Sequence, residues 1–368
     1  MAGMFRATHT APLLVRVRSR ECCKYLYRIM QFLGFFLSLI LNFKILTAGA
    51  FLGVLQISAN TVSAMIKAII GLFCLSRLHK TEAVLDQLDD RLQNDSDRHK
   101  MHKAVARCNF IVFLYVILYL GYAASVFVAG ILTGQPPWMV YFPLVNWQDG
   151  IGQYWIHSLI EYVLLSIALM EALVWDTYAL VFITIFRAHV DILKDHIQHL
   201  RNDPNKTEAD NYEDLVACII DHKLILESCD LMRPVMSRTI FVQFLLIGIV
   251  LGIILINVLY FSDIYRAISS IVFFTGVMLE TFPFCYFCDS LVDDCAELSN
   301  LLCQSNWLDA EPKYKLTLRI FLQNLQQPII FIAGGIIRIS VTSNINVAKF
   351  AFSVMTVVQN LNLADRFI

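Results

Sequence analysis

Residues 328–368, at the end of the chain, read PIIFIAGGIIRISVTSNINVAKFAFSVMTVVQNLNLADRFI. The stretch is apolar enough to enter a bilayer, yet it carries Arg338, Lys349, two adjacent glycines and a polar cluster at 340–346. Charged and polar side chains within a membrane segment usually face protein or water rather than lipid. Two interpretations follow: a last helix that closes a bundle by packing, or a pore-lining helix whose polar side faces a channel.

The composition predicts a membrane protein. Of the 368 residues, 57% are hydrophobic and only 16% are charged, and the mean hydropathy is +0.61. A soluble chain of this length carries more charge. The net charge of −1 gives no indication of a nucleic-acid partner. None of the ten cysteines lies between residues 134 and 150, which argues against an extracellular disulfide framework there.

Seven apolar runs predict an all-α bundle of seven membrane-spanning helices. The first run, residues 29–43, has only 15 residues, whereas a helix needs about 20 to cross the hydrocarbon. We therefore expect a truncated first span. The other runs are 45–75, 110–133, 151–186, 239–262, 267–288 and the final stretch.

Basic residues orient the bundle through the positive-inside rule. Lys and Arg number six in residues 1–28, seven in 77–107 and seven in 187–238, whereas residues 134–150 contain none. These segments alternate consistently if the N-terminus is cytoplasmic. With seven spans, the C-terminus is then extracellular.

This orientation disfavours a G-protein-coupled receptor, whose N-terminus is outside. The chain also lacks Asp-Arg-Tyr after the third span and Asn-Pro-x-x-Tyr in the seventh. For a membrane enzyme, the strongest candidate site is a set of metal-type side chains near the end of the fourth span. We interpret this set as a solvated helix face, and we expect neither a catalytic site nor a cofactor. The set comprises His189, Asp191, Asp195, His196 and His199.

Charged residues inside the apolar runs leave two readings open. Glu161, Glu171 and Asp176 either form hydrogen bonds between helices or couple to an ion or proton. Lys67 stands near the predicted inner end of the second span, where we expect its amine to reach the membrane surface by snorkelling.

Short motifs that are typical of one protein family occur along nearly the whole chain after Lys44. In the C-terminal part they are FPFCYFC at 282–288, QSNW at 304–307, QQPIIFIAGG at 326–335, SNI at 343–345, KFAFS at 349–353 and NLA at 362–364. Upstream they are PPW at 136–138, DTY at 176–178, FRAH at 186–189 and RTIFVQ at 238–243. In this order, the motifs resemble those of insect odorant receptors. Gustatory receptors share the fold, but their last span usually carries Thr-Tyr, which is absent before Gln359 here.

The resemblance implies a tuning subunit that binds a small volatile odorant. Members of that family are seven-span proteins in the plasma membrane of olfactory sensory dendrites, and they form heterotetrameric cation channels with an odorant co-receptor. It further implies a cytoplasmic N-terminal segment at 1–28, a six-span ligand-binding bundle at 29–288, cytoplasmic anchor helices at 289–337, and a pore-lining seventh span with a short extracellular end at 338–368.

Specific residues follow from the same resemblance. Val357 matches the hydrophobic gate of the pore, where a constriction closes by dewetting, and Asn360 matches the polar position beyond it; Ser353 and Thr356 join this pore set. The family's odorant pocket lies among the second, third, fourth and sixth spans. By depth, the candidates here are Asn60, Thr61, Tyr119, Tyr122, Ser125, Tyr162, Ser166 and Met278. Ordinary helix packing is the alternative interpretation for each of them.

Overall fold

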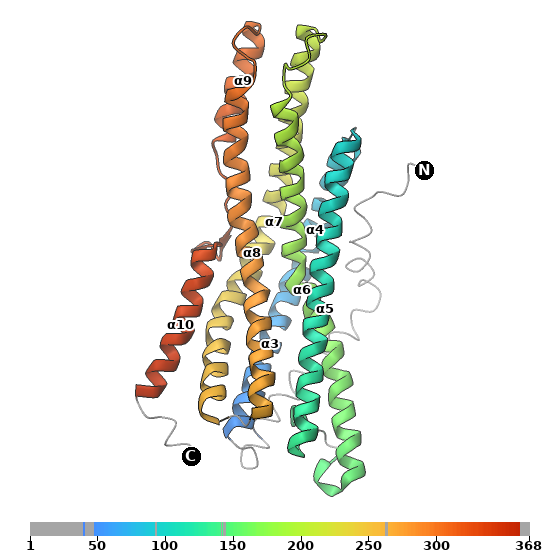
Figure 1. Cartoon of the computed structure of the whole chain (residues 1–368), viewed down its shortest axis with the longest axis vertical. Helices are drawn as coiled ribbons and strands as arrows, with labels where there is room; N and C mark the ends of the chain where they lie inside the picture. The colour runs from blue at the N-terminus through green and yellow to red at the C-terminus, as the bar shows by residue number, and fades with distance from the viewer. Residues whose placement is uncertain are drawn as a thin grey trace.

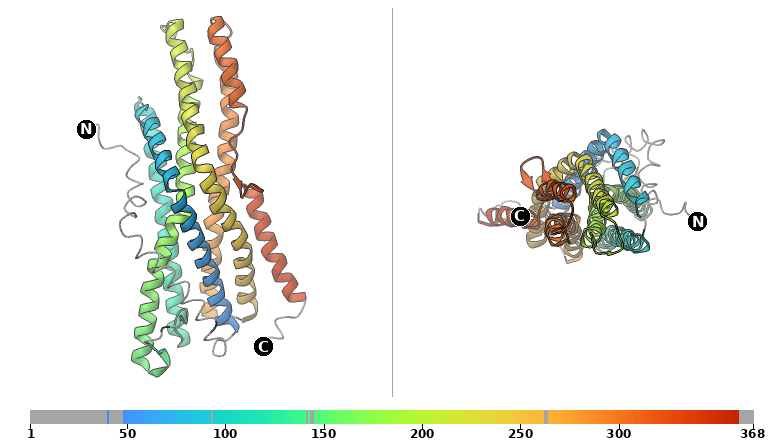
Figure 2. Two further views of the ribbon diagram at one scale, coloured as in Figure 1. Left: turned by 180° about the vertical axis from the view of Figure 1, so that it is seen from behind. Right: turned by 90° about the horizontal axis from the view of Figure 1, so that it is seen from above.

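The computed structural model describes residues 40, 48–92, 94–140, 142, 145–261 and 264–360. Long helices run roughly side by side in an elongated bundle, and the last one leans away from the rest (Figures 1 and 2). The helices are α3 (Ala48–Phe73), α4 (Leu75–Asp90), α5 (Asp95–Thr133), α6 (Ile151–Gln198), α7 (Glu208–Ile256), α8 (Ile264–Gln304), α9 (Pro312–Leu325) and α10 (Val341–Asn360). A short 3₁₀ helix, η3 (Trp147–Asp149), precedes α6, and a short π-helix, η4 (Asn257–Phe261), directly follows α7.

Five helices of the described part are long and apolar enough to cross a membrane. They are α3, α5, α6, α7 with η4, and α8. They match the second to the sixth predicted spans, and α10 occupies the seventh with 20 residues. The predicted first span at 29–43 lies outside the described residues except for Ile40. The all-helical, multi-span prediction is confirmed over the described chain.

The membrane helices extend well past the apolar runs that predicted them. The sequence pattern ends the fourth span at Phe186, but α6 continues without a break to Gln198. Val190, Leu193 and Ile197 recur at helical spacing and are fully buried, so the hydrophilic segment still has a core-facing stripe. A capping box at Thr207 and Asp210 then begins α7, which returns beside α6.

The segment at 289–337 is not helical throughout, in contrast to the prediction of anchor helices. After α9, strands β1 (Ile332–Ala333) and β2 (Ile337–Arg338) pair as an antiparallel hairpin. Its turn contains Gly334 and Gly335 with φ of 59° and 72°, the left-handed region that glycine adopts without strain. The backbone N–H of Gly334 donates to the carbonyl of Ser237 on α7 at 3.0 Å. The glycine pair therefore forms a docked turn rather than a break within a span.

At the end of the bundle where α6 connects to α7, the long helices pack around α9. The guanidinium of Arg201, between α6 and α7, forms two hydrogen bonds of 2.6 Å with Glu208. It also lies 5.2 Å from the ring centroid of Tyr314 on α9. Burial raises the pKa of the Tyr314 hydroxyl to about 12, so the ring beneath the cation is neutral.

Helix α7 organises the bundle because it contacts α3, α4, α6 and α10. Small residues allow the close approach of α10: the Cα atoms of Gly248 and Gly252 face Phe350 and Val354. Next to this contact, a second buried cluster brings together Ile57, Tyr122, Leu165 and Phe273 from α3, α5, α6 and α8. The candidate site lies in and below this second cluster.

Candidate functional site

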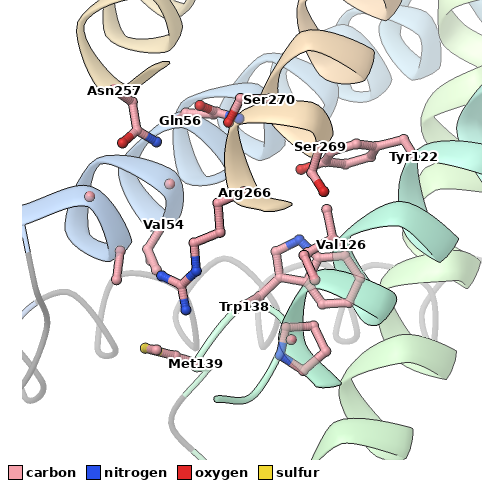
Figure 3. A pocket seen from close by; sticks show the side chains of 16 residues that line it. Val54, Gln56, Tyr122, Val126, Trp138, Met139, Asn257, Arg266, Ser269 and Ser270 are labelled. Atoms are coloured by element: carbon pink, nitrogen blue, oxygen red, sulfur yellow. The ribbon is translucent and has the colours of Figure 1, made fainter. Parts of the chain in front are cut away.

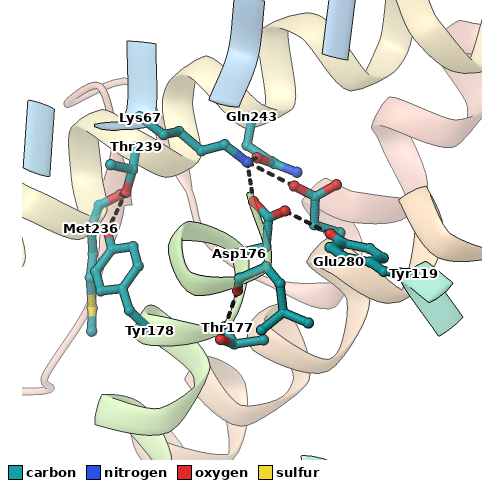
Figure 4. Close-up of polar contacts among 10 residues, drawn as sticks. Lys67, Tyr119, Asp176, Thr177, Tyr178, Met236, Thr239, Gln243 and Glu280 are labelled. Atoms are coloured by element: carbon teal, nitrogen blue, oxygen red, sulfur yellow. Dashed lines mark hydrogen bonds and ion pairs between the residues drawn. The ribbon is translucent and has the colours of Figure 1, made fainter. Parts of the chain in front are cut away.

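A buried ion cluster joins the membrane helices at mid-length. The ammonium of Lys67 on α3 forms ion pairs with Asp176 on α6 and with Glu280 Oε1 on α8, the latter at 2.7 Å. It also donates to Gln243 Oε1 on α7 at 2.5 Å (Figure 4). Lys67 is only 3% exposed. The expectation that this amine snorkels to the membrane surface is therefore wrong, because two carboxylates inside the bundle compensate its charge.

Two tyrosines of α5 complete the cluster. The hydroxyl of Tyr119 donates to Asp176 Oδ2 at 2.6 Å, and the hydroxyl of Tyr115 donates to the carbonyl of Leu279. Five helices thus meet at one polar point in an apolar surrounding, where an unpaired charge is costly. For Asp176, the geometry favours hydrogen bonding between helices over the alternative of ion coupling.

A cavity, here called the inner chamber, opens directly beside this cluster. It lies between α3, α5, α6 and α8, and Tyr119 and Glu280 are the groups it shares with the ion cluster. Apart from Asn60, its remaining lining is aliphatic and aromatic, as expected for a site that binds a small apolar molecule. The lining residues are Asn60, Leu118, Tyr119, Tyr122, Leu169, Ala172, Val272, Phe273, Gly276, Val277 and Glu280.

A second cavity, here called the outer chamber, lies toward the loop between α5 and α6 (Figure 3). It holds about 590 Å³ of space between atoms, its opening to solvent included. Tyr122 lines both chambers and forms the wall between them. Besides Tyr122, the outer chamber is lined by Gly49, Ala50, Gly53, Val54, Gln56, Val126, Ala129, Gly130, Pro137, Trp138, Met139, Asn257, Arg266, Ser269 and Ser270.

The loop over the outer chamber is fastened by Glu161 of α6. Its carboxylate accepts hydrogen bonds from the backbone N–H groups of Trp138, at 3.0 Å, and Val140, at 2.5 Å. The Nε2 atom of His157 lies 3.1 Å from the same carboxylate. Glu161 therefore anchors the loop, which favours hydrogen bonding over ion or proton coupling as the role of this acid.

The predicted odorant-contacting residues divide into two groups. Asn60, Tyr119 and Tyr122 line the inner chamber, and Thr61 lines a neighbouring groove between α3 and α6 together with Asn60. The others line none of these three cavities. Ser125 donates to the carbonyl of Tyr122, Tyr162 packs against Phe127, Ser166 has a buried hydroxyl without a partner, and Met278 packs against the second core cluster.

The apolar half of the inner chamber was not predicted from the sequence. It includes Phe273, Gly276 and Val277 on α8. The signal was present in the run 267–288, where these residues and Glu280 stand at helical i, i+3 and i+4 spacings. Only the packing of α5 and α6 against α8 shows that this face is hollow.

The predicted pore residues all lie on α10. Val357 is 55% exposed, Ser353 and Asn360 are exposed, and Thr356 is half-buried. The hydroxyls of Ser353 and Thr356 donate to carbonyls of their own helix. The opposite face is buried through Asn344, Ala351 and Met355, so α10 packs on the bundle by one face and presents the predicted pore residues on another.

No group of three potential metal ligands occurs among the described residues. His189 is buried beside Asp89, with 3.5 Å between Nε2 and Oδ1, and His196 lies 3.0 Å from Asp97. The prediction of a solvated face is wrong for His189, which packs against α4. His189 and His196 pair with acids of neighbouring helices, whereas His199 bonds to the backbone carbonyl of Asp195.

Comparison with known proteins identifies the fold and the family. The structure is similar to that of the insect olfactory receptor OR5 from Machilis hrabei, with a TM-score of 0.77, 13% sequence identity, and coverage of 97% of this chain and 92% of that one. The structure of the same receptor in complex with eugenol matches with a TM-score of 0.74, again at 13% identity, over 98% and 93% of the two chains.

Curated relatives are much more similar in sequence. Odorant receptor 59b of Drosophila melanogaster is 47% identical over 99% of this chain and its own full length. Odorant receptor 42b of the same species is 43% identical, with 99% of each chain covered. The family model described as 7tm Odorant receptor matches residues 47–352. The chain therefore belongs to the family of insect odorant receptors, multi-span membrane proteins, and it is an odorant receptor.

Proposed function

We propose that this receptor binds a small volatile odorant in the inner chamber and thereby gates a non-selective cation channel that it forms with an odorant co-receptor. The observation that carries the proposal is the position of the chamber, which lies between α3, α5, α6 and α8 and is bordered by Glu280. The next residue, Thr281, accepts a hydrogen bond from Asn344 of α10 at 2.6 Å. A ligand that shifts α8 thus has a direct contact through which to shift α10.

The chamber favours an apolar ligand with at most one or two polar groups. Most of its lining is hydrocarbon, and polar groups come from Asn60, the hydroxyls of Tyr119 and Tyr122, and Glu280. Such a site gains affinity from burial of apolar surface and orientation from its few polar atoms. The receptor from Machilis hrabei, whose fold this chain shares, has been solved with eugenol, a ligand of this chemical type.

The remaining parts of the proposal concern assembly and orientation. Four subunits, this chain and co-receptor among them, would surround a pore lined by α10, with Val357 at the gate and Ser353, Thr356 and Asn360 on the same lining. The N-terminus would be cytoplasmic and the C-terminus extracellular, as the basic residues predict. The C-terminal part of α8, together with α9 and the hairpin of β1 and β2, would form the cytoplasmic anchor. The assembled channel would lie in the plasma membrane of olfactory dendrites.

The test is odour-evoked current in cells that express this chain with the co-receptor while G-protein signalling is blocked. The informative variant is Gly276→Val, because an added Cβ meets only the Leu118 side chain, at 3.7 Å, while the rest of the valine enters the chamber. We expect it to raise the half-maximal odorant concentration by about tenfold, the effect of losing about 1.4 kcal/mol of binding. The matched control is Gly121→Val on α5, where no atom lies within 4 Å of the new Cβ.

Three results would contradict the proposal. Abolition of the response by the G-protein block would show a G-protein-coupled receptor, and a full response without the co-receptor would point to a channel of the gustatory type. Equal responses of Gly276→Val and Gly121→Val, at equal surface expression, would remove the inner chamber as the odorant site.

A further inference from the structure

A polar stripe runs along the exposed face of α10. Its members recur every three or four residues, the spacing that keeps side chains on one side of a helix. All of them are exposed except Thr356, which is half-buried. The face that packs on the bundle lies opposite, because the buried Ala351 stands about 200° around the helix from Lys349. The polar stripe consists of Thr342, Asn346, Lys349, Ser353, Thr356 and Asn360.

Lys349, in the middle of the polar stripe, has no compensating charge. Its ammonium forms no ion pair or hydrogen bond with any residue that the structure describes. Lys67, by contrast, is buried between two carboxylates. An unpaired charge within a membrane-spanning helix is costly in hydrocarbon and is normally found facing water or protein. The exposed ammonium of Lys349 therefore needs water beside α10.

Snorkelling to the membrane surface is the alternative explanation for this lysine. It accounts for Lys349 alone and would leave the polar side chains farther along the stripe in lipid. Large apolar side chains flank the stripe on both sides, since Phe350 and Phe352 are 56% and 57% exposed. A polar face bounded by two apolar flanks favours a helix that meets water along one line only.

We propose that Lys349 lines the cation path of the channel and lowers its permeability to divalent cations relative to monovalent ones. The inference rests on the proposed function, in which α10 lines the pore. A fixed positive charge reduces the local concentration of cations, and the reduction is squared for a divalent ion because the energy is proportional to the ion's charge. At a distance of about 10 Å across water, one lysine gives about a twofold reduction for a monovalent and about a fourfold reduction for a divalent ion.

A thiol at position 349 reports whether this position meets water, without use of channel current. Lys349→Cys is expressed with the co-receptor, and opened membranes are treated with trimethylammonium-ethyl methanethiosulfonate, which does not enter lipid. Mass spectrometry of the peptide that contains residue 349 measures the rate of modification. The matched control is Phe350→Cys, at nearly the same depth but about 100° around the helix. Because the thiolate is the reactive species, we expect modification at least about tenfold faster at position 349.

Lys349→Gln tests the effect of the charge on ions. The change removes the charge but keeps a polar side chain. The ratio of Ca²⁺ to Na⁺ permeability, taken from the reversal potential of the odour-evoked current, should rise about twofold. Lys349→Arg keeps the charge and should retain the original ratio. Lys103→Gln removes an exposed lysine of α5, on the side of the bundle away from α10 (Figure 1), and should leave the ratio unchanged.

Two results would overturn the inference and leave the proposed function in place. Equal modification of the thiols at 349 and 350 would show that the lysine faces lipid or protein. An unchanged permeability ratio in Lys349→Gln, with normal odour-evoked current, would show that its charge does not act on the ions. Absence of current from the unmodified receptor would instead contradict the proposed function, and this inference with it.

Discussion

Asn344 and Thr281 connect α10 to α8 through a hydrogen bond of 2.6 Å in which the amide Nδ2 donates to the hydroxyl Oγ1. Thr281 directly follows Glu280, whose carboxylate belongs to the ion cluster and borders the inner chamber. Successive helix residues point about 100° apart, because one turn takes 3.6 residues. One turn of α8 thus faces the chamber on one side and the last helix on the other.

Thr281→Val should alter gating rather than odorant binding. The valine keeps the shape of the threonine but removes the acceptor, which leaves the buried Asn344 amide without this bond, at a cost of about 1–3 kcal/mol. If the bond is made in only one of the closed and open states, the current without odorant and the maximal current should both change. The measurement is whole-cell current with co-receptor over a range of odorant concentrations.

The control for this change is Thr275→Val, six residues earlier on α8. Thr275 is exposed, and its hydroxyl donates only to the carbonyl of Ile271 in its own helix. Identical basal and maximal currents in Thr281→Val and the unmodified receptor, at equal surface expression, would show that this bond does not participate in gating.

Lys67→Met should severely reduce the amount of folded receptor. The change leaves Asp176 and Glu280 buried near each other without the ammonium between them. Removal of one partner from a buried ion pair typically costs about 3–5 kcal/mol. Surface labelling of an extracellular epitope and fluorescence-detected size-exclusion chromatography measure the loss.

A compensating change distinguishes lost charge balance from lost packing. Lys67→Met combined with Glu280→Gln removes one of the two uncompensated carboxylates and should recover part of the surface expression. The control combines Lys67→Met with Glu297→Gln, a change at an exposed acid of α8. If surface expression recovers equally in the two double variants, the charge explanation is contradicted.

The sequence predicted the helices well and the cavities poorly, for physical reasons. Apolar runs reveal which segments cross a membrane, since each needs about 20 residues of hydrocarbon character. The run does not reveal where a helix stops, as α6 shows by continuing 12 residues past Phe186 on a narrow buried stripe. The positions of charged residues were known, but the partners of Lys67 lie 109 and 213 residues away. Only the packed bundle brings them together.

The residues of the candidate site were likewise predictable from the sequence only in part. Tyr119 and Tyr122 could be placed on one face of a helix from their spacing alone, and both line the inner chamber. Ser125 satisfies the same spacing but donates to its own helix backbone. Spacing identifies a face, whereas the hollow beside that face depends on the neighbouring helices.

Glu161→Ala should loosen the loop above the outer chamber. The change removes the acceptor of the Trp138 and Val140 N–H groups, and two unsatisfied backbone donors would remain. We expect faster proteolysis within residues 134–150 and a lower melting temperature in detergent. Gln153→Ala, at an exposed position of α6 about two turns nearer its start, is the control. Equal proteolysis of the two variants would show that Glu161 does not anchor the loop.

Gly71→Ala should destabilise the contact between α3 and α6. A Cβ at position 71 would overlap the indole of Trp175. Overpacking of this kind costs about 1–3 kcal/mol, although alanine is otherwise the better helix former by about 1 kcal/mol. Gly121→Ala meets no atom and should instead preserve or raise the melting temperature of the receptor in detergent. Adding Trp175→Leu to Gly71→Ala frees the space and should restore part of the loss. If the double variant is no more stable than the sum of the single changes, the indole is not the source of the strain.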